Sequence, residues 1–193
     1  MPTDDLAPGM LLASPGLRDP NFVHSVVLLG RAGDEGALGW VVNGRELMTI
    51  RELLTSSDLL PREQAIPETP AFSSAVRVGG PVAPAAGWLL YRRLTEPLAG
   101  EIPIGADLAV TGEMAAFTAL LQGHGPLDFR MLLGCAGWAP GQLEAEIGAG
   151  AWLPAAVSAA LVMDTQSAFV WDEAYQLAVG TQPAAFSRHR GKA

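Results

Sequence analysis

Cysteine is almost absent from this sequence, since Cys135 is the only one in 193 residues. A single cysteine cannot form an intrachain disulfide, and nothing in the sequence points to an oxidising compartment. Lysine is equally scarce, with Lys192 alone. The opening MPTDDLAPGM carries two acids where a Sec signal has a basic segment, so we expect a cytoplasmic protein.

Long apolar runs are missing as well. The longest uncharged span, 147–163, falls short of the ~20 residues that a membrane-spanning helix needs. It also contains Gly148, Gly150 and Pro154. We therefore expect no membrane association.

Positive charge is scarce throughout. Twelve Lys and Arg residues stand against twenty Asp and Glu residues, which gives a formal net charge of -8. The resulting field repels nucleic acids and anionic membranes unless a basic patch overrides it. Arg92-Arg93 is too short to be such a patch, and Arg188-His189-Arg190 falls in a predicted tail. We do not expect direct nucleic-acid binding.

Apolar residues, in contrast, are plentiful. They make up 49% of the chain, and charged residues only 17%, which supplies material for a packed core. The length favours a single domain over 1–180, either undivided or built from two interleaved lobes. Residues 181–193 lack an apolar period and are expected to form a mobile tail.

Short β-rich runs and a few helical periods predict a mixed α and β protein. Strands are expected at 10–13, 22–29, 37–42, 75–78, 87–91, 102–104, 108–111, 130–134 and 161–163. The second and third should form a hairpin with a loop of about six residues, and His24 should share an apolar face of the second. Helices are expected at 49–56, 113–121, 140–148 and 169–179, the first from the capping-box spacing of Thr49 and Glu52.

The central stretch is FRMLLGCAGWAPGQLEAEIGAGAW, residues 129–152. A buried strand should end at Gly134, and a glycine turn carrying Trp138 should lead into a helix starting at Pro140. One interpretation is a structural corner, in which Trp138 fills the core and Gln142 caps the backbone. The other is an anion site at the helix N-terminus, although Glu144 and Glu146 would repel a phosphate there.

Two further positions suggest either a backbone corner or the edge of a cleft. Asn43 precedes Gly44 at the end of a predicted strand, where it either forms a turn or presents its amide to a pocket. Gly79 and Gly80 precede Pro81, which predicts a sharp corner.

Groups that could carry catalysis or bind a metal are sparse. Cys135 has no basic residue beside it in sequence to lower its pKa, and the three histidines are far apart in sequence. Glu144 and Glu146 lie two apart on one predicted helix, so they point in different directions. We predict no catalytic residues, no metal site and no cofactor.

Several segments resemble the bacterial YqgE/AlgH family in order and spacing: PGMLLASPGLRDPNF, SVVLL, GALGWVVN, RVGGPV and GCAGWAPGQLEAEI. The resemblance covers nearly the whole chain. It implies an α+β fold in which a mixed, bifurcated β-sheet curls into a pseudo-barrel with helices packed on the outside. The family carries a transcriptional-regulator label without an established mechanism. The residues that match its pattern, with roles left open, are Asn43, Gly79, Gly80, Gly137, Trp138, Gln142 and Glu144.

These observations favour a non-enzymatic binding or regulatory protein, with those seven residues as candidate binding residues. Its ligand would be an unidentified small molecule or protein partner. The alternative is an enzyme acting on a small molecule in a cleft near Asn43, Gly80 and Trp138.

Overall fold

The computed structural model describes residues 6–56 and 65–180, so the predicted tail at 181–193 lies outside the described residues. Its strands are β1 (Gly9–Ala13), β2 (Val26–Gly33), β3 (Gly36–Val41), β4 (Glu46–Thr49), β5 (Ala75–Val78), β6 (Val82–Arg92), β7 (Ile102–Ile104), β8 (Leu108–Thr111), β9 (Phe129–Trp138) and β10 (Trp152–Ala155). Its helices are α1 (Ile50–Ser56), the 3₁₀ helix η2 (Pro70–Ser73), α2 (Met114–Leu121), α3 (Gln142–Gly148), α4 (Ala159–Asp164) and α5 (Ser167–Val179).

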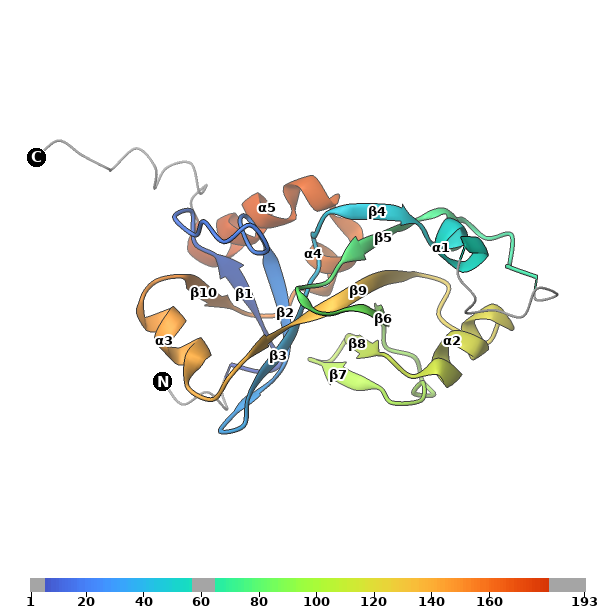
Figure 1. Cartoon of the computed structure of the whole chain (residues 1–193), viewed down its shortest axis with the longest axis horizontal. Coiled ribbons are helices and arrows are strands. Elements are labelled where there is room, and N and C mark those ends of the chain that lie inside the picture. The colour runs from blue at the N-terminus through green and yellow to red at the C-terminus, as the bar shows by residue number, and fades with distance from the viewer. Residues whose placement is uncertain (1–5, 57–64, 181–193) are drawn as a thin grey trace, which may run out of the picture.

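A single curled sheet runs through the described part of the chain and branches at β9 (Figure 1). The main path is β10-β1-β2-β3-β9-β6-β8-β7. The first half of β9 also pairs in parallel with β5, from Val76 opposite Met131 to Val78 opposite Leu133. Its second half pairs antiparallel with β3, where Leu38 is opposite Gly137. The predicted α+β fold with a mixed, bifurcated and curled sheet is confirmed.

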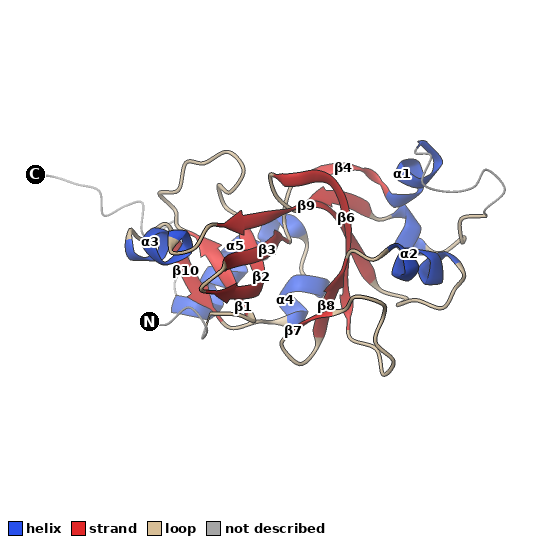
Figure 2. Cartoon of the chain, turned by 60° about the horizontal axis from the view of Figure 1, so that its bottom comes forward, coloured by secondary structure: helices blue, strands red, loops and turns tan. Residues whose placement is uncertain are grey.

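The long strand β9 supplies side chains to all three apolar cores because successive residues of a strand point to opposite faces. Leu132 belongs to a core under α4 and α5, Met131 to a core under α1 and α2, and Trp138 to a core under α3. Figure 2 shows α3 near one end of the molecule and α1 and α2 at the other, with the sheet between them. β9 therefore contributes to the packing under the helices at both ends of the sheet.

Local sequence signals set several element ends. The Thr49 backbone N–H donates to Glu52 Oε2 at 2.7 Å and the Glu52 N–H donates to Thr49 Oγ1 at 3.1 Å, which is the predicted capping box. At the other end of the chain, α5 stops at Gly180, whose φ of 67° is the left-handed conformation that glycine adopts easily.

Four local predictions are wrong. Residues 161–163 lie in α4, with Ser158 as its N-cap, because a short apolar run does not by itself distinguish strand from helix. The β2–β3 hairpin closes with Gly33 opposite Gly36, which leaves a two-residue turn instead of about six. His24 has a φ of 54° and precedes β2, so it is not on that strand.

The fourth wrong prediction concerns the central stretch. β9 continues through Gly134 to Trp138, because β3 and β6 supply pairing partners for its second half. The following helix starts at Gln142, two residues later than predicted, with Gly141 as its N-cap.

Candidate binding site

The seven predicted site residues fall in three separate places. Asn43 follows β3, Gly79 and Gly80 cross β9 at Gly134, and the remaining four lie along the end of β9 and the start of α3. Each place has its own local chemistry, which decides what its residues can offer a ligand.

The side-chain amide of Asn43 is committed to the backbone. Its Oδ1 accepts from the Val26 N–H at 2.8 Å, and its Nδ2 donates to the His24 carbonyl at 2.9 Å. These two bonds fasten the loop before β2 to the end of β3. The contacts support a structural role, since the amide holds two separate backbone segments together.

Gly79, Gly80 and Gly134 lie where two backbones cross. A Cβ on Gly80 would lie 2.3 Å from the carbonyl carbon of Cys135, and one on Gly134 would lie 2.4 Å from the Gly80 oxygen. Both residues also have positive φ, 149° and 75°. Gly79 accepts from the Val41 N–H and donates to the Leu133 carbonyl. Glycine is required here because the two backbones approach each other so closely that a side chain on either would clash with the other.

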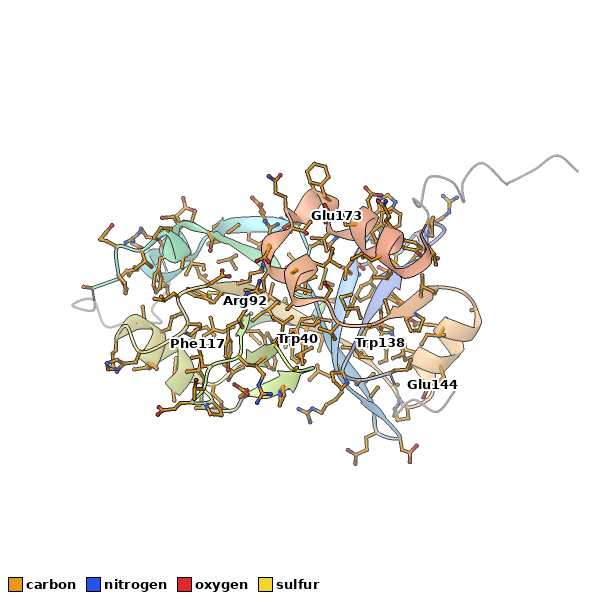
Figure 3. The ribbon with its side chains drawn as sticks, turned by 180° about the vertical axis from the view of Figure 1, so that it is seen from behind. Trp40, Arg92, Phe117, Trp138, Glu144 and Glu173 are labelled. Atoms are coloured by element: carbon orange, nitrogen blue, oxygen red, sulfur yellow. The ribbon has the colours of Figure 1, made fainter. Side chains whose placement is uncertain are left out.

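Trp138 and Gln142 attach α3 to the sheet. Gln142 Oε1 accepts from the Ala139 N–H at 3.0 Å, and Trp138 is 6% exposed. The predicted corner, with a core tryptophan and a capping glutamine, is therefore present. Glu144 is half-buried in the first turn of α3 and Gly137 is exposed on β9 (Figure 3).

Glu146 is the acceptor at the centre of this corner, a role that its neighbours in sequence do not predict. Its Oε2 accepts both indole N–H groups, from Trp138 at 2.9 Å and from Trp152 at 2.8 Å. Its Oε1 accepts from Gln142 Nε2 at 2.9 Å. The only sequence signal for these contacts is the i, i+4 spacing of Gln142 and Glu146 on a helix.

The most apolar of the described pockets lies elsewhere, between α1 and α2 over β6 and β9. It has a volume of about 530 Å³. Its lining consists of Ile50, Leu53, Leu54, Phe72, Ala85, Gly87, Gly112, Met114, Phe117, Thr118, Leu120, Leu121, Met131 and Leu133. We call it the α1–α2 cavity; Phe117 in Figure 3 marks its end of the molecule, opposite Trp138.

The α1–α2 cavity offers a ligand almost no polar partner. None of the described residues that line it is ionisable. The one hydroxyl, on Thr118, donates to the Met114 carbonyl at 3.0 Å. Met114 is 59% exposed, so the edge of the cavity reaches the surface at α2. A site of this kind selects for apolar area and shape.

The predicted site and this cavity do not overlap. Of the seven predicted residues, Trp138 alone lines a described cavity, a polar one of about 610 Å³ beside the β2–β3 hairpin. The sequence predicts helices at 49–56 and 113–121 but not a space between them. Whether α1 and α2 pack fully against the sheet or leave a cavity depends on the distances between these elements in the folded protein, and local sequence patterns do not determine those distances.

Reactive side chains do not gather anywhere else in the described part of the chain. Cys135 is buried, and burial raises the pKa of its thiol, which opposes formation of the nucleophilic thiolate. His24 stacks on Trp171 with ring centroids 4.2 Å apart. Within residues 6–56 and 65–180, no group of three His, Cys, Asp or Glu side chains is placed to hold a metal ion. Those residues also contain no helix of sufficient length and apolarity to cross a bilayer.

The branched, curled sheet with its glycine crossing is the fold of a small α+β protein. The AlgH-like family model, DUF179, matches residues 10–183. The chain belongs to this AlgH-like family.

Relatives extend over nearly the whole chain. A UPF0301 protein from Anaeromyxobacter dehalogenans (strain 2CP-C) is 40% identical over 190 residues, 96% of this chain and 95% of that protein. A UPF0301 protein from Rhizobium rhizogenes is 34% identical over 186 residues, with 95% and 90% covered.

Two solved structures share the fold. The solution structure of AlgH from Pseudomonas aeruginosa superposes with a TM-score of 0.73 at 28% identity, covering 97% of this chain and 96% of that one. A crystal structure of a Corynebacterium diphtheriae protein gives a TM-score of 0.72 at 22% identity, with 95% and 93% covered. The second shows similarity of fold alone.

Proposed function

We propose that this protein is a non-enzymatic binding protein that holds a small, uncharged apolar molecule in the α1–α2 cavity. The observation that carries the proposal is the cavity itself, which has a volume of about 530 Å³ and no ionisable group among the described residues that line it. Small-molecule sites in proteins typically occupy about 300–1,000 Å³ and are mostly apolar. A charged ligand would lose its hydration there without gaining a partner.

A protein that binds such a ligand is suited to a regulatory role, in which it acts by holding the ligand or by contacting a protein partner. Direct nucleic-acid binding forms no part of the proposal, because the net charge is -8. We also infer a cytoplasmic location, which the single cysteine supports. The enzymatic alternative gains no support from its residues, since the Asn43 amide bonds to two backbone groups and Gly80 has no side chain to offer a substrate.

The test uses N-phenyl-1-naphthylamine, a neutral dye that fluoresces when it leaves water. We expect saturable binding of one dye per chain to the full-length protein. Gly87→Leu should abolish it, because a Cβ at Gly87 points toward Phe117 and Met131 at 3.4 and 3.5 Å without a clash. The remaining atoms of the leucine would then occupy the cavity.

Gly148→Leu is the matched control. It makes the same change at the end of α3, where a Cβ would meet nothing within 4 Å. We expect this variant to bind dye like the parent. Equal dye binding by the Gly87→Leu variant, or equal loss in both variants, would overturn the proposal.

A further inference from the structure

Another polar cavity, of about 460 Å³, lies on the face of β9 opposite the α1–α2 cavity. Its lining consists of Glu46 from β4, Arg77 from β5, Arg130 from β9, Asp164, Thr165, Gln166, Ser167 and Ala168. Arg130 and Met131 are adjacent on β9, so their side chains point to opposite faces of the sheet. This cavity is therefore distinct from the α1–α2 cavity, which Met131 lines.

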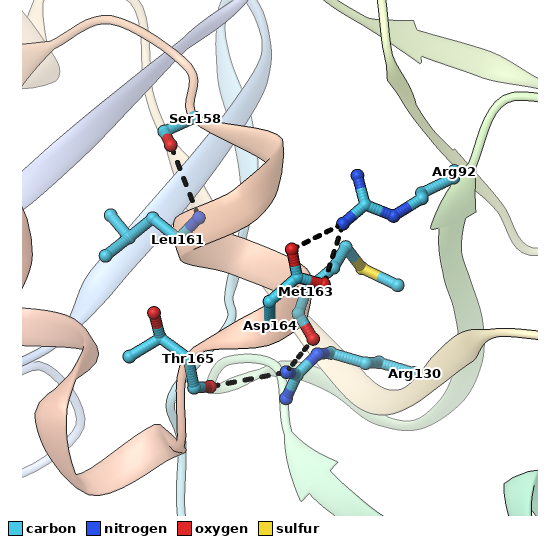
Figure 4. Close-up of polar contacts among 7 residues, drawn as sticks. All are labelled: Arg92, Arg130, Ser158, Leu161, Met163, Asp164 and Thr165. Carbon is cyan, nitrogen blue, oxygen red and sulfur yellow. Dashed lines mark hydrogen bonds and ion pairs between the residues drawn. The ribbon is translucent and has the colours of Figure 1, made fainter.

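Both carboxylates that line this polar cavity are already paired with an arginine. Glu46 pairs with Arg77 at 2.6 Å, and Asp164 pairs with Arg92 through both carboxylate oxygens at 2.7 and 2.8 Å. Among the described residues, no carboxylate lies within salt-bridge distance of Arg130, whose Nη2 donates to the carbonyls of Met163 and Thr165 at 2.8 and 3.4 Å (Figure 4). One half-buried guanidinium thus faces the cavity without a carboxylate of its own.

Burial opposes the charge of Arg130. It lowers the pKa of the guanidinium, and the like charge of Arg77 lowers it further, while Asp128 and Asp164 raise it. An anion placed between Arg77 and Arg130 would relieve both unfavourable effects.

The N-terminus of α5, which lines this cavity, also has a polar group without a hydrogen-bond partner. α5 has 13 residues, and its N-cap Gln166 makes no side-chain hydrogen bond to the first turn. The Ser167 hydroxyl lies at the first helical position, exposes less than 1 Å² and has no hydrogen-bond partner. Buried hydroxyls normally have a partner, and helix N-termini favour negative charge.

We propose that this cavity binds the oxyanion group, carboxylate or phosphoryl, of a small molecule. Arg130 and Arg77 supply the charge from the sheet. Ser167 and the first-turn N–H groups of α5 supply neutral donors from the opposite wall. The site is independent of the proposed apolar ligand, since the two cavities lie on opposite faces of β9.

The test titrates inorganic phosphate, and separately acetate, into the full-length ¹⁵N-labelled protein while sodium chloride keeps the ionic strength constant. We expect saturable amide shifts centred on residues 166–169. A stronger response to phosphate indicates a phosphoryl ligand, and a stronger response to acetate a carboxylate.

Two variants remove the site by different routes. Arg130→Gln should weaken binding by about tenfold or more, the size of one charge-assisted hydrogen bond. Ala168→Glu places a negative charge in the cavity at the start of α5, where it favours the helix while repelling an anion. The second variant keeps the test decisive if the first folds poorly.

The matched controls are Arg31→Gln, an exposed arginine on β2, and Ala178→Glu at the other end of α5. Both should bind phosphate like the parent. Shifts spread over the surface, shifts reproduced by chloride alone, or equal binding by the Ala168→Glu variant would each overturn the proposal.

Discussion

Replacing Glu146 with alanine tests how α3 is held to the sheet. The substitution removes the acceptor for two indole N–H groups, on Trp138 and Trp152. A buried donor left without a partner costs about 1–3 kcal/mol, so two cost about 2–6 kcal/mol. We expect about 2–4 kcal/mol, because the two tryptophans keep 6% and 4% of their surface exposed, where water can replace part of the loss.

The measurement is urea unfolding followed by tryptophan fluorescence, with the free energy of unfolding obtained by linear extrapolation. Glu146→Gln keeps one amide oxygen as an acceptor and should lose about half as much. Glu96→Ala is the control, an exposed glutamate in a loop that should change stability by less than about 0.5 kcal/mol. A loss below about 1 kcal/mol for Glu146→Ala would refute the assigned role of the carboxylate.

Three other predictions follow from individual residues. Gly80→Ala should prevent folding, as judged by circular dichroism, because the added Cβ would lie 2.3 Å from the Cys135 backbone. The control, Gly137→Ala, should fold normally, since its Cβ would meet only Val82 Cγ2 at 3.6 Å. Burial raises the pKa of Tyr175 to about 12, and burial with the Glu101 hydrogen bond raises that of Tyr91 still higher. Folded protein should therefore show no phenolate absorbance step near pH 10, and such a step would contradict the burial of the tyrosines. The free energy of unfolding should fall as the pH rises from about 10 through 12, because the tyrosines of the unfolded chain ionise first. Cys135 should react with a thiol reagent only at the rate of unfolding, and rapid reaction of folded protein would contradict its burial.

The sequence predicted those features that neighbouring residues decide. Thr49 and Glu52 are three residues apart, so their capping box could be identified directly, and it is present. The order and spacing of glycine-rich segments such as RVGGPV carried the family resemblance, and through it the branched sheet. The corner predicted at Gly80 is present, and two backbones approach so closely there that only glycine fits.

Features that depend on distant residues were not predictable in the same way. The second half of β9 is a strand because β3 lies beside it, although its own residues suggested a turn. Glu146 was noted only as an acid near a helix N-terminus, since nothing local shows that two tryptophans converge on it. Asn43 was noticed as a polar strand end, but its partners lie 17 and 19 residues away.

The α1–α2 cavity belongs to that second group. Its walls come from α1, α2, β6 and β9, and its volume is set by the gap they leave. The sequence specifies the apolar faces, while the gap exists only in the assembled fold.

The most direct measurement of ligand binding in that cavity uses the methionine methyl groups as reporters. The chain has six methionines, of which Met114 and Met131 line the α1–α2 cavity. With ¹³C-methyl labelling, saturating N-phenyl-1-naphthylamine should shift the signals of these two and leave those of Met10, Met48 and Met163 unchanged. Unchanged Met114 and Met131 signals, or equal shifts of Met10 and Met163, would contradict binding in the cavity.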